Sequence, residues 1–331
     1  FECAAMTAAP AVTDLQKIPA LAPKARKELA GALEGRPFAR NNGMHGFGRL
    51  TYADGRVYEG QWKDGKEHGQ GKISYIDGST YKGEFQNGQL SGMAEFISSD
   101  GNVYRGQFLE GHEHGEGEFC SVNGDNYAGQ FQRGRFHGAG FYAFATAEKY
   151  RPNPAFIYDG EWEDGMRHGK GILKEFDPSQ PYDPHNPPKP VSEYSGMWAQ
   201  GKRNGEGLFR YASGDTYNGQ WNDNLRHGKG KYKKWNPETQ EVGDVYSGQW
   251  VQGKQHGKGT LKYENGDTYE GFFEDGHQHG QGKYTYANGD LFEGQYWLGR
   301  RFGEGRFTEH PDNMPGWKKC LRLGPTGPRR A

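Results

Sequence analysis

Histidine is the residue type whose spacing in this sequence could do chemistry. Eight of the twelve histidines stand directly before a glycine and recur along the chain. His112-x-His114 and His277-x-His279 would each point two imidazoles to one face of a strand, a spacing that can chelate zinc. No cysteine or clustered third ligand accompanies either pair, and a catalytic histidine would not recur in every repeat. We therefore expect a structural role for His45, His68, His114, His137, His168, His227, His256 and His279.

The recurring Gly-x-Gly pairs could be mistaken for phosphate-binding loops. They lack the GxxxxGKS/T string and the helix that follows such a loop. Neither the GxSxG of a serine hydrolase nor the HExxH of a metalloprotease occurs in the sequence. We therefore expect no enzyme activity, no cofactor and no metal.

The composition excludes several further classes of protein. The 331 residues include 54 Gly, and aromatic side chains (20 Tyr, 19 Phe and 8 Trp) stand where aliphatic ones are usual. A formal net charge of -1 gives no field that would attract nucleic acid. Cys3, Cys120 and Cys320 lie far apart, which argues against a disulfide-built secreted fold and for a reducing compartment. No run reaches the ~18 apolar residues of a transmembrane helix.

The chain begins at Phe1 with a short alanine-rich stretch. This start leaves open that a targeting peptide has been removed. In that case the protein would be an accessory subunit of an organellar complex.

A repeat of about 23 residues organises most of the chain. Residues 58–80 read YEGQWKDGKEHGQGKISYIDGST, and residues 81–103 read YKGEFQNGQLSGMAEFISSDGNV. Three units are lengthened to 31, 36 and 29 residues, and a half unit precedes the first full one. The array therefore covers residues 42–310. Its ten full units open at Tyr58, Tyr81, Tyr104, Tyr127, Tyr158, Tyr194, Tyr217, Tyr246, Tyr269 and Phe292.

Each unit predicts two strands with an aromatic face. Alternation along a strand puts Tyr58, Gly60 and Trp62 on one face. In the second strand, Gly69 and Gly71 share one face by the same rule. We expect the rings to lie over the bare backbone of these glycines, because aromatic covering of strand glycines stabilises sheets.

The turns complete the predicted hairpins. Asp64-Gly65 and Asp77-Gly78 supply the positive φ angles that tight turns need. A lone hairpin of ~20 residues is not stable, so neighbouring hairpins must stack. We therefore expect an all-β fold, an elongated single-layer antiparallel sheet of stacked β-hairpins with a short N-terminal helix.

The string Tyr-x-Gly-x-Trp/Phe, followed after a turn by His-Gly-x-Gly, resembles the MORN repeat family. The array covers about 80% of the chain. The resemblance implies a scaffold role, because MORN repeats organise other proteins or lie near membranes. Within the family, the chain looks most like MORN-only proteins of ciliary radial-spoke heads and of protist cytoskeletons.

Departures from the repeat pattern are local. Residues 91–94 read SGMA in place of His-Gly-x-Gly, and Asn204 and Phe302 replace the histidine. Asn224 stands where a turn glycine is usual, and asparagine tolerates the left-handed conformation. We expect the array to continue through all of them.

Three insertions lengthen the same type of turn, at residues 141–157, 172–193 and 231–245. They should protrude from the same long edge, and insertions on one side of a repeat array often mark a binding side. Tolerated drift in loop length is the alternative, because surface loops accept insertions cheaply. Six prolines between residues 178 and 190 predict an extended, polyproline-like segment. The candidate contacts are Tyr150, Phe156, Tyr182, Pro187, Pro188 and Trp235.

Two segments flank the array. In residues 1–41, the stretch 24–34 follows Pro23 and precedes Gly35, which predicts a short amphipathic helix. This helix would cover the first strand or dock a partner. Residues 311–331 form a basic tail, either solvated or in contact with an acidic surface.

The sequence predicts a non-enzymatic structural scaffold that organises protein partners in a large assembly. We expect it in the cytoplasm, in a ciliary or flagellar axoneme or in the cytoskeleton. The open sheet edges would also allow a homodimer. The ring face could form a groove for a partner segment, or its rings could only pack on each other and on glycines. The candidate groove residues are Trp62, Phe85, Phe108, Phe131, Trp162, Trp198, Trp221, Trp250, Phe273 and Tyr296.

A phospholipid-binding, membrane-associated tether is the alternative function. A membrane-surface protein is expected to carry a basic or amphipathic face. Charges such as Lys63 and Glu59 alternate in sign, so the sequence predicts no continuous basic face.

Overall fold

The computed structural model describes residues 43–145, 154–177, 179–180, 183 and 185–313. This part of the chain contains 21 strands and one 3-10 turn, η2 (Pro311–Asn313). The chain divides into two compact units, residues 1–202 and 203–331. The predicted helix at 24–34 lies outside the described residues.

The first unit holds twelve strands. They are β1 (Gly46–Thr51), β2 (Val57–Lys63), β3 (Lys66–Ser74), β4 (Thr80–Gln86), β5 (Gln89–Ile97), β6 (Val103–Leu109), β7 (His112–Cys120), β8 (Asn126–Gln132), β9 (Arg135–Ala145), β10 (Pro154–Glu163), β11 (Met166–Glu175) and β12 (Ser192–Ala199).

The second unit starts within β13, one residue after that strand begins. Its strands are β13 (Lys202–Arg210), β14 (Thr216–Asn222), β15 (Leu225–Asn236), β16 (Glu241–Val251), β17 (Lys254–Lys262), β18 (Thr268–Glu274), β19 (His277–Thr285), β20 (Leu291–Trp297) and β21 (Arg300–Thr308).

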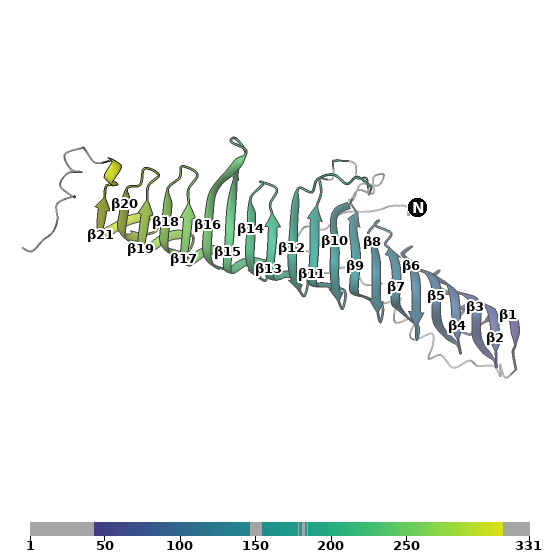
Figure 1. Ribbon diagram of the computed structural model, residues 1–331. Helices are drawn as coiled ribbons and strands as arrows, with labels where there is room; N and C mark the ends of the chain where they lie inside the picture. Colours follow the sequence, from purple (N-terminus) through teal and green to yellow (C-terminus); the bar gives the residue numbers. More distant parts are fainter. Residues whose placement is uncertain (1–42, 146–153, 178, 181–182, 184, 314–331) are drawn as a thin grey trace, which may run out of the picture. The chain divides into compact units, whose positions relative to one another are not determined.

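Within each unit, strands that follow one another in the sequence pair antiparallel. For example, β2 pairs with β1 and β3, and β14 pairs with β13 and β15. The strands of each unit lie side by side in one layer (Figure 1). The predicted fold class, an all-β single layer of stacked antiparallel hairpins, is therefore confirmed in both units.

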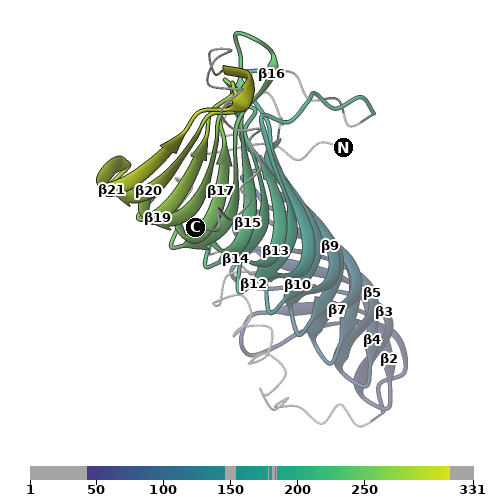
Figure 2. The ribbon, with the colours of Figure 1, turned by 60° about the vertical axis from the view of Figure 1, so that its left-hand side comes forward.

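Ten turns of two residues each join the first strand of a hairpin to its second strand. Both residues of each turn are left-handed, as at Asp64 (φ 50°) and Gly65 (φ 71°). Asn224 (φ 71°) keeps this geometry without a glycine, as predicted. Such turns match the right-handed twist of the strands, and Figure 2 shows that twist in β17 to β21.

A tyrosine ring covers a pair of glycines in each typical hairpin. Gly60 on β2 and Gly71 on β3 lie opposite each other. A Cβ atom at either glycine would come within 2.5–2.6 Å of the Tyr58 hydroxyl oxygen. Tyr58 itself is fully buried and donates its hydroxyl hydrogen to the carbonyl oxygen of Gln61 (2.7 Å). The predicted covering of strand glycines by rings is confirmed here.

The second aromatic residue of each unit links one hairpin to the one before it. The Trp62 ring lies over Gly48 on β1, and its Nε1 donates to the Gly48 carbonyl oxygen (3.3 Å). It also meets Tyr58 edge to face, with 5.0 Å between ring centroids. Phe85 of the next hairpin meets Tyr58 in the same way, also at 5.0 Å. Edge-to-face contacts of this kind therefore form a continuous ring core along each unit.

A bulge breaks the regular pairing in each hairpin. The register shifts between Gly60 and Trp62, and Gly69 has φ +61°. A Cβ atom at Gly69 would overlap Gln61 Oε1, and that oxygen accepts the backbone N–H of Gln70 (3.2 Å). The expectation that Gly69 makes room for a ring, as Gly71 does, is therefore wrong. Its left-handed backbone turns it toward Gln61 on the opposite face.

We predict that Gly248→Val destabilises the second unit. A Cβ atom at Gly248 would lie 2.5 Å from the Tyr246 hydroxyl oxygen and 2.6 Å from Gly259 Cα. Overpacking of this kind lowers the free energy of unfolding by about 1–3 kcal/mol. Thermal melting followed by circular dichroism measures the loss. Ser247→Val, on the exposed neighbouring position, is the control, and equal melting of the two variants would contradict the ring-over-glycine packing.

We also predict a cooperative alkaline unfolding. Burial, reinforced by the Glu67 carboxylate, raises the pKa of Tyr58 to about 12, and burial raises the pKa of Tyr81, Tyr104 and Tyr246 further. Above the usual tyrosine pKa of about 10, the unfolded chain loses these protons first. The contribution of these tyrosines to stability should therefore be constant below about pH 10 and fall as the pH rises toward 12. Tyrosinate absorbance that reaches the value for all twenty tyrosines near pH 10, with no loss of strand signal, would contradict this.

Candidate functional site

The predicted groove residues form the ring core and have almost no exposed surface. The exposed fraction of each is between 2% and 4%. A partner could reach these rings only by displacing their neighbours. The prediction that the row holds a partner segment is untested, and the packing of the rings gives it no support. The buried residues are Trp62, Phe85, Phe108, Phe131, Trp162, Trp198, Trp221, Trp250, Phe273 and Tyr296.

The face opposite the ring core is called the outer face here. Strand alternation places Glu59, Gln61 and their equivalents on it. Among the described residues, one hollow on this face of each unit is bounded by part of an insertion.

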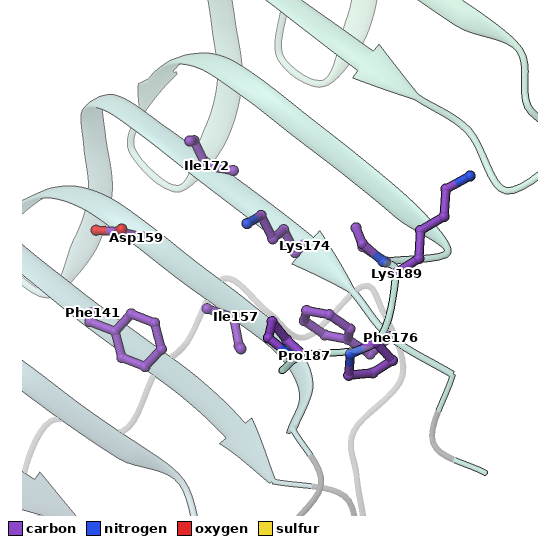
Figure 3. Close-up of a pocket in the computed structure, with 10 residues that line it drawn as sticks. Phe141, Ile157, Asp159, Ile172, Lys174, Phe176, Pro187 and Lys189 are labelled. Atoms are coloured by element: carbon purple, nitrogen blue, oxygen red, sulfur yellow. The ribbon is translucent and has the colours of Figure 1, made fainter. Parts of the chain in front are cut away.

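The first hollow, called the proline hollow, has a volume of about 280 Å³ (Figure 3). Its floor comes from β9, β10 and β11, where Asp159 lies opposite both Phe141 and Ile172. Residues 187–190 form its wall, and Pro187 lies between Ile157 and Phe176 in Figure 3. The lining residues are Phe141, Ile157, Asp159, Ile172, Lys174, Phe176, Pro187, Pro188, Lys189 and Pro190.

Backbone hydrogen bonds tie the second insertion to the sheet. The Phe176 N–H donates to the Ala155 carbonyl oxygen (3.0 Å), and the Val191 N–H donates to that of Glu175 (2.8 Å). Phe176 is consequently buried, at 5% exposure, whereas Phe141 is 41% exposed. The described part of the insertion thus folds back over the outer face.

The lining of the proline hollow suits an apolar side chain of a partner. Its volume is near the lower end of the range for ligand pockets. Phe141 and Ile172 remain partly exposed on its floor, and Asp159 and Lys174 place one charge of each sign there. An arrangement of this kind can fix the orientation of a docked segment.

The second hollow, called the lysine hollow, has a volume of about 600 Å³. It lies on the outer face of β13, β14 and β15, beside the lengthened β15–β16 hairpin, in which Trp235 pairs with Val242. Four of its ten lining residues are cationic, and none is acidic. The lining residues are Leu208, Arg210, Gly214, Thr216, Asn218, Lys231, Lys233, Lys234, Trp235 and Val242.

Asp215 fixes the tryptophan that bounds the lysine hollow. Its carboxylate accepts the Trp235 backbone N–H (2.8 Å) and the Tyr232 hydroxyl. Burial opposes ionisation of Asp215, but these hydrogen bonds outweigh it and lower the pKa of the carboxyl. The Trp235 ring packs against Gly214, in the turn before β14.

The predicted partner contacts fall into three groups. Pro187, Pro188 and Trp235 line the hollows. Phe156 pairs with Phe144 on the ring side of the sheet, with 6.3 Å between ring centroids. Tyr150 and Tyr182 lie outside the described residues. Partner binding by any of the six stays a prediction.

Two recurring side chains that accept backbone hydrogen bonds were not predicted from the sequence. The first is the glutamine that fills the bulge, as Gln61 and Gln220 do with their side-chain oxygens. The second is the turn aspartate that accepts a backbone N–H twenty residues later, as Asp267 does from Ala287 and Asp290 from His310. The repeated Gly-Gln and Asn-Gly-Asp strings were the available signal.

No group of three or more His, Cys, Asp or Glu residues within the described ranges is placed to hold a metal ion. The same ranges contain no helix that is long and apolar enough to cross a membrane.

The MORN repeat model matches eleven stretches of the chain. The matched stretches are 40–55, 58–80, 81–103, 104–126, 127–146, 158–174, 194–216, 217–234, 246–268, 269–291 and 292–308.

The chain belongs to the MORN repeat family.

The matches stop at residues 146, 174 and 234 and resume at 158, 194 and 246. The unmatched gaps lie within the three insertions, so the residues that wall both hollows are additions to the repeat. MORN repeats are structural and binding modules rather than an enzyme family.

A search among curated proteins finds no match. Two solved structures give weak likenesses. The G-box domain of the microcephaly protein CPAP is 9% identical, with a TM-score of 0.29, and the match covers 80% of this chain and 99% of that one. The TCP domain of SAS-4 of Drosophila melanogaster, in complex with a proline-rich motif, is 9% identical, with a TM-score of 0.24 and coverages of 73% and 90%.

We predict that Phe176→Ala lowers the free energy of unfolding by about 3 kcal/mol, because it empties a buried site under the second insertion. Phe141→Ala, in the same hollow, removes a partly exposed ring and should cost less than about 1 kcal/mol. Chemical denaturation of the two variants measures the difference. Equal losses would mean that residues 187–190 do not cover Phe176.

Proposed function

We propose that this chain is a non-enzymatic scaffold that holds protein partners in a large assembly, within a ciliary or flagellar axoneme or the cytoskeleton. The observation that carries the proposal is the difference between the two faces of the sheet. The rings of one face are buried in the core. The outer face has hollows whose walls are formed by residues outside the repeat. The resemblance to MORN-only ciliary and cytoskeletal proteins supports the choice of assembly.

The proline hollow is the contact that the proposal assigns to a partner. Its exposed floor residues, Phe141 and Ile172, contribute nothing to the ring core, so the fold does not require them. An apolar partner side chain would cover both and remove this surface from water.

The test is affinity purification of the tagged full-length protein from its native cells, read by mass spectrometry. We expect axonemal or cytoskeletal proteins in fixed ratio, retained in detergent. The double variant Phe141→Ser with Ile172→Ser should lose them while the chain remains folded, which thermal melting would verify.

Val251→Ser with Phe272→Ser is the matched control. These residues also lie on the outer face and are 41% and 44% exposed, against 41% and 37% for Phe141 and Ile172. The control should keep the partners. Recovery of membrane proteins that are lost in detergent would favour a lipid-associated tether, and co-purifying respiratory or photosynthetic subunits would favour an organellar accessory subunit. Either result would overturn the proposed assembly.

A further inference from the structure

Strand β15 carries an unusual row of lysines on its outer face. Lys229, Lys231 and Lys233 occupy the three alternating positions that follow the bulge glycine, Gly228. Eleven strands of the array hold these three positions, and β15 is the one with lysine at all three. β7, for example, has Glu116 and Glu118 at the first two.

Both neighbouring strands leave this row without an opposite charge. Lys231 lies opposite Asn218 on β14 and opposite Ser247 on β16. Lys233 lies opposite Thr216 and Val245. Lys229 lies opposite Gln249 on β16.

On some other strands of the array, lysines at equivalent positions lie beside carboxylates. Lys72 on β3 lies between Glu59 on β2 and Lys82 on β4. Lys82 in turn lies opposite Glu95 on β5. Lys283 on β19 lies opposite Glu270 on one side and Glu293 on the other. Carboxylates thus accompany these lysines, whereas the row on β15 has none opposite it.

The row is also electrostatically unfavourable on its own. Alternate residues on a strand stand about 7 Å apart, so three ammonium groups repel one another along β15. All three lysines are exposed, and none forms an ion pair among the residues that the structure describes. A bound anion would relieve this repulsion.

The lysine hollow extends the row and gives it an apolar end. Lys234 and Arg210 add positive charge beside Lys231 and Lys233. Trp235 and Val242, which pair across the lengthened hairpin, form the wall beyond them. A ligand that follows β15 would therefore meet positive charge first and then an aromatic and an aliphatic side chain.

The shape and the surrounding charges favour a narrow ligand over a membrane. Glu238 and Glu241 are exposed at the turn of the β15–β16 hairpin, beyond the hollow. Beside this turn, Glu264 accepts a hydrogen bond from the side-chain amide of Asn236. A flat anionic bilayer would meet these carboxylates, which repel it. An extended peptide can lie within the row, and its alternate side chains have the same ~7 Å spacing as the lysines.

We propose that the outer face of β15, with the lysine hollow, docks an extended acidic segment of a partner protein. Alternate carboxylates of that segment would pair with Lys229, Lys231 and Lys233, and an apolar residue would pack against Trp235. This inference rests on the proposed scaffold function and assigns the chemistry of a second partner contact.

The test uses the full-length chain and a fluorescein-labelled peptide of about twelve residues, long enough to span the row and the hollow. The peptide alternates Glu and Thr and has Leu at each end. We expect binding by fluorescence anisotropy that weakens as salt is added. The combined variant Lys229→Gln, Lys231→Gln and Lys233→Gln should weaken it about tenfold.

The matched control is Lys63→Gln, Lys72→Gln and Lys82→Gln, which removes the same charge in the first unit. It should bind the peptide as the parent chain does. A peptide with Gln in place of Glu should not bind. Circular dichroism melting should show that neither triple variant is less stable than the parent, as expected for exposed lysines.

Three results would overturn the inference. They are absence of peptide binding, equal weakening by both triple variants, and binding to phosphatidylserine-containing vesicles with none to the peptide. The proposed function is judged separately, by partner recovery through Phe141 and Ile172. Partners retained together with a failed peptide test would therefore reject this inference alone.

Discussion

The structure depends on one contact, the face of a tyrosine ring against two glycines that lie opposite each other on paired strands. At Gly60 and Gly71 no side chain larger than a methyl group has room beneath Tyr58. In the β4–β5 hairpin, Ala94 stands opposite Gly83 with Tyr81 still fully buried. The ring brings a hydroxyl group to the backbone, where it satisfies a carbonyl group beside the bulge. One layer of strands can therefore form a core without a second layer to cover it.

This contact also determines where binding can occur. Because the rings are buried against one another, the outer face is the face that remains available for binding. The insertions form the walls of the hollows on it. The family's repeat supplies a regular surface, and the additions to that repeat make parts of it distinctive. The proline hollow is mostly apolar and the lysine hollow is cationic, so the two hollows suit partners of different chemistry.

Most of the fold could be predicted from the sequence, because the repeat carries its own geometry. Period-two alternation identified the ring face, and Asn224 was correctly expected to preserve its turn. Alternation failed at Gly69, because a left-handed bulge residue leaves the regular pleat. The hollows could not be predicted, since they depend on how residues 187–190 fold back and on which side chains lie across from Lys231. Which residues lie opposite each other depends on the register of the paired strands, and each bulge shifts that register.

The left-handed turns restrict how such a chain can evolve in length. Both residues of each short turn have positive φ, so an added residue there would disturb the match between turn and strand twist. The opposite turns carry no such restriction, and all three insertions lie in them. Duplication can add whole repeats, but new loops can arise at only one edge. Related chains would therefore differ in the loops of these opposite turns, while the ring packing of their repeats stayed the same.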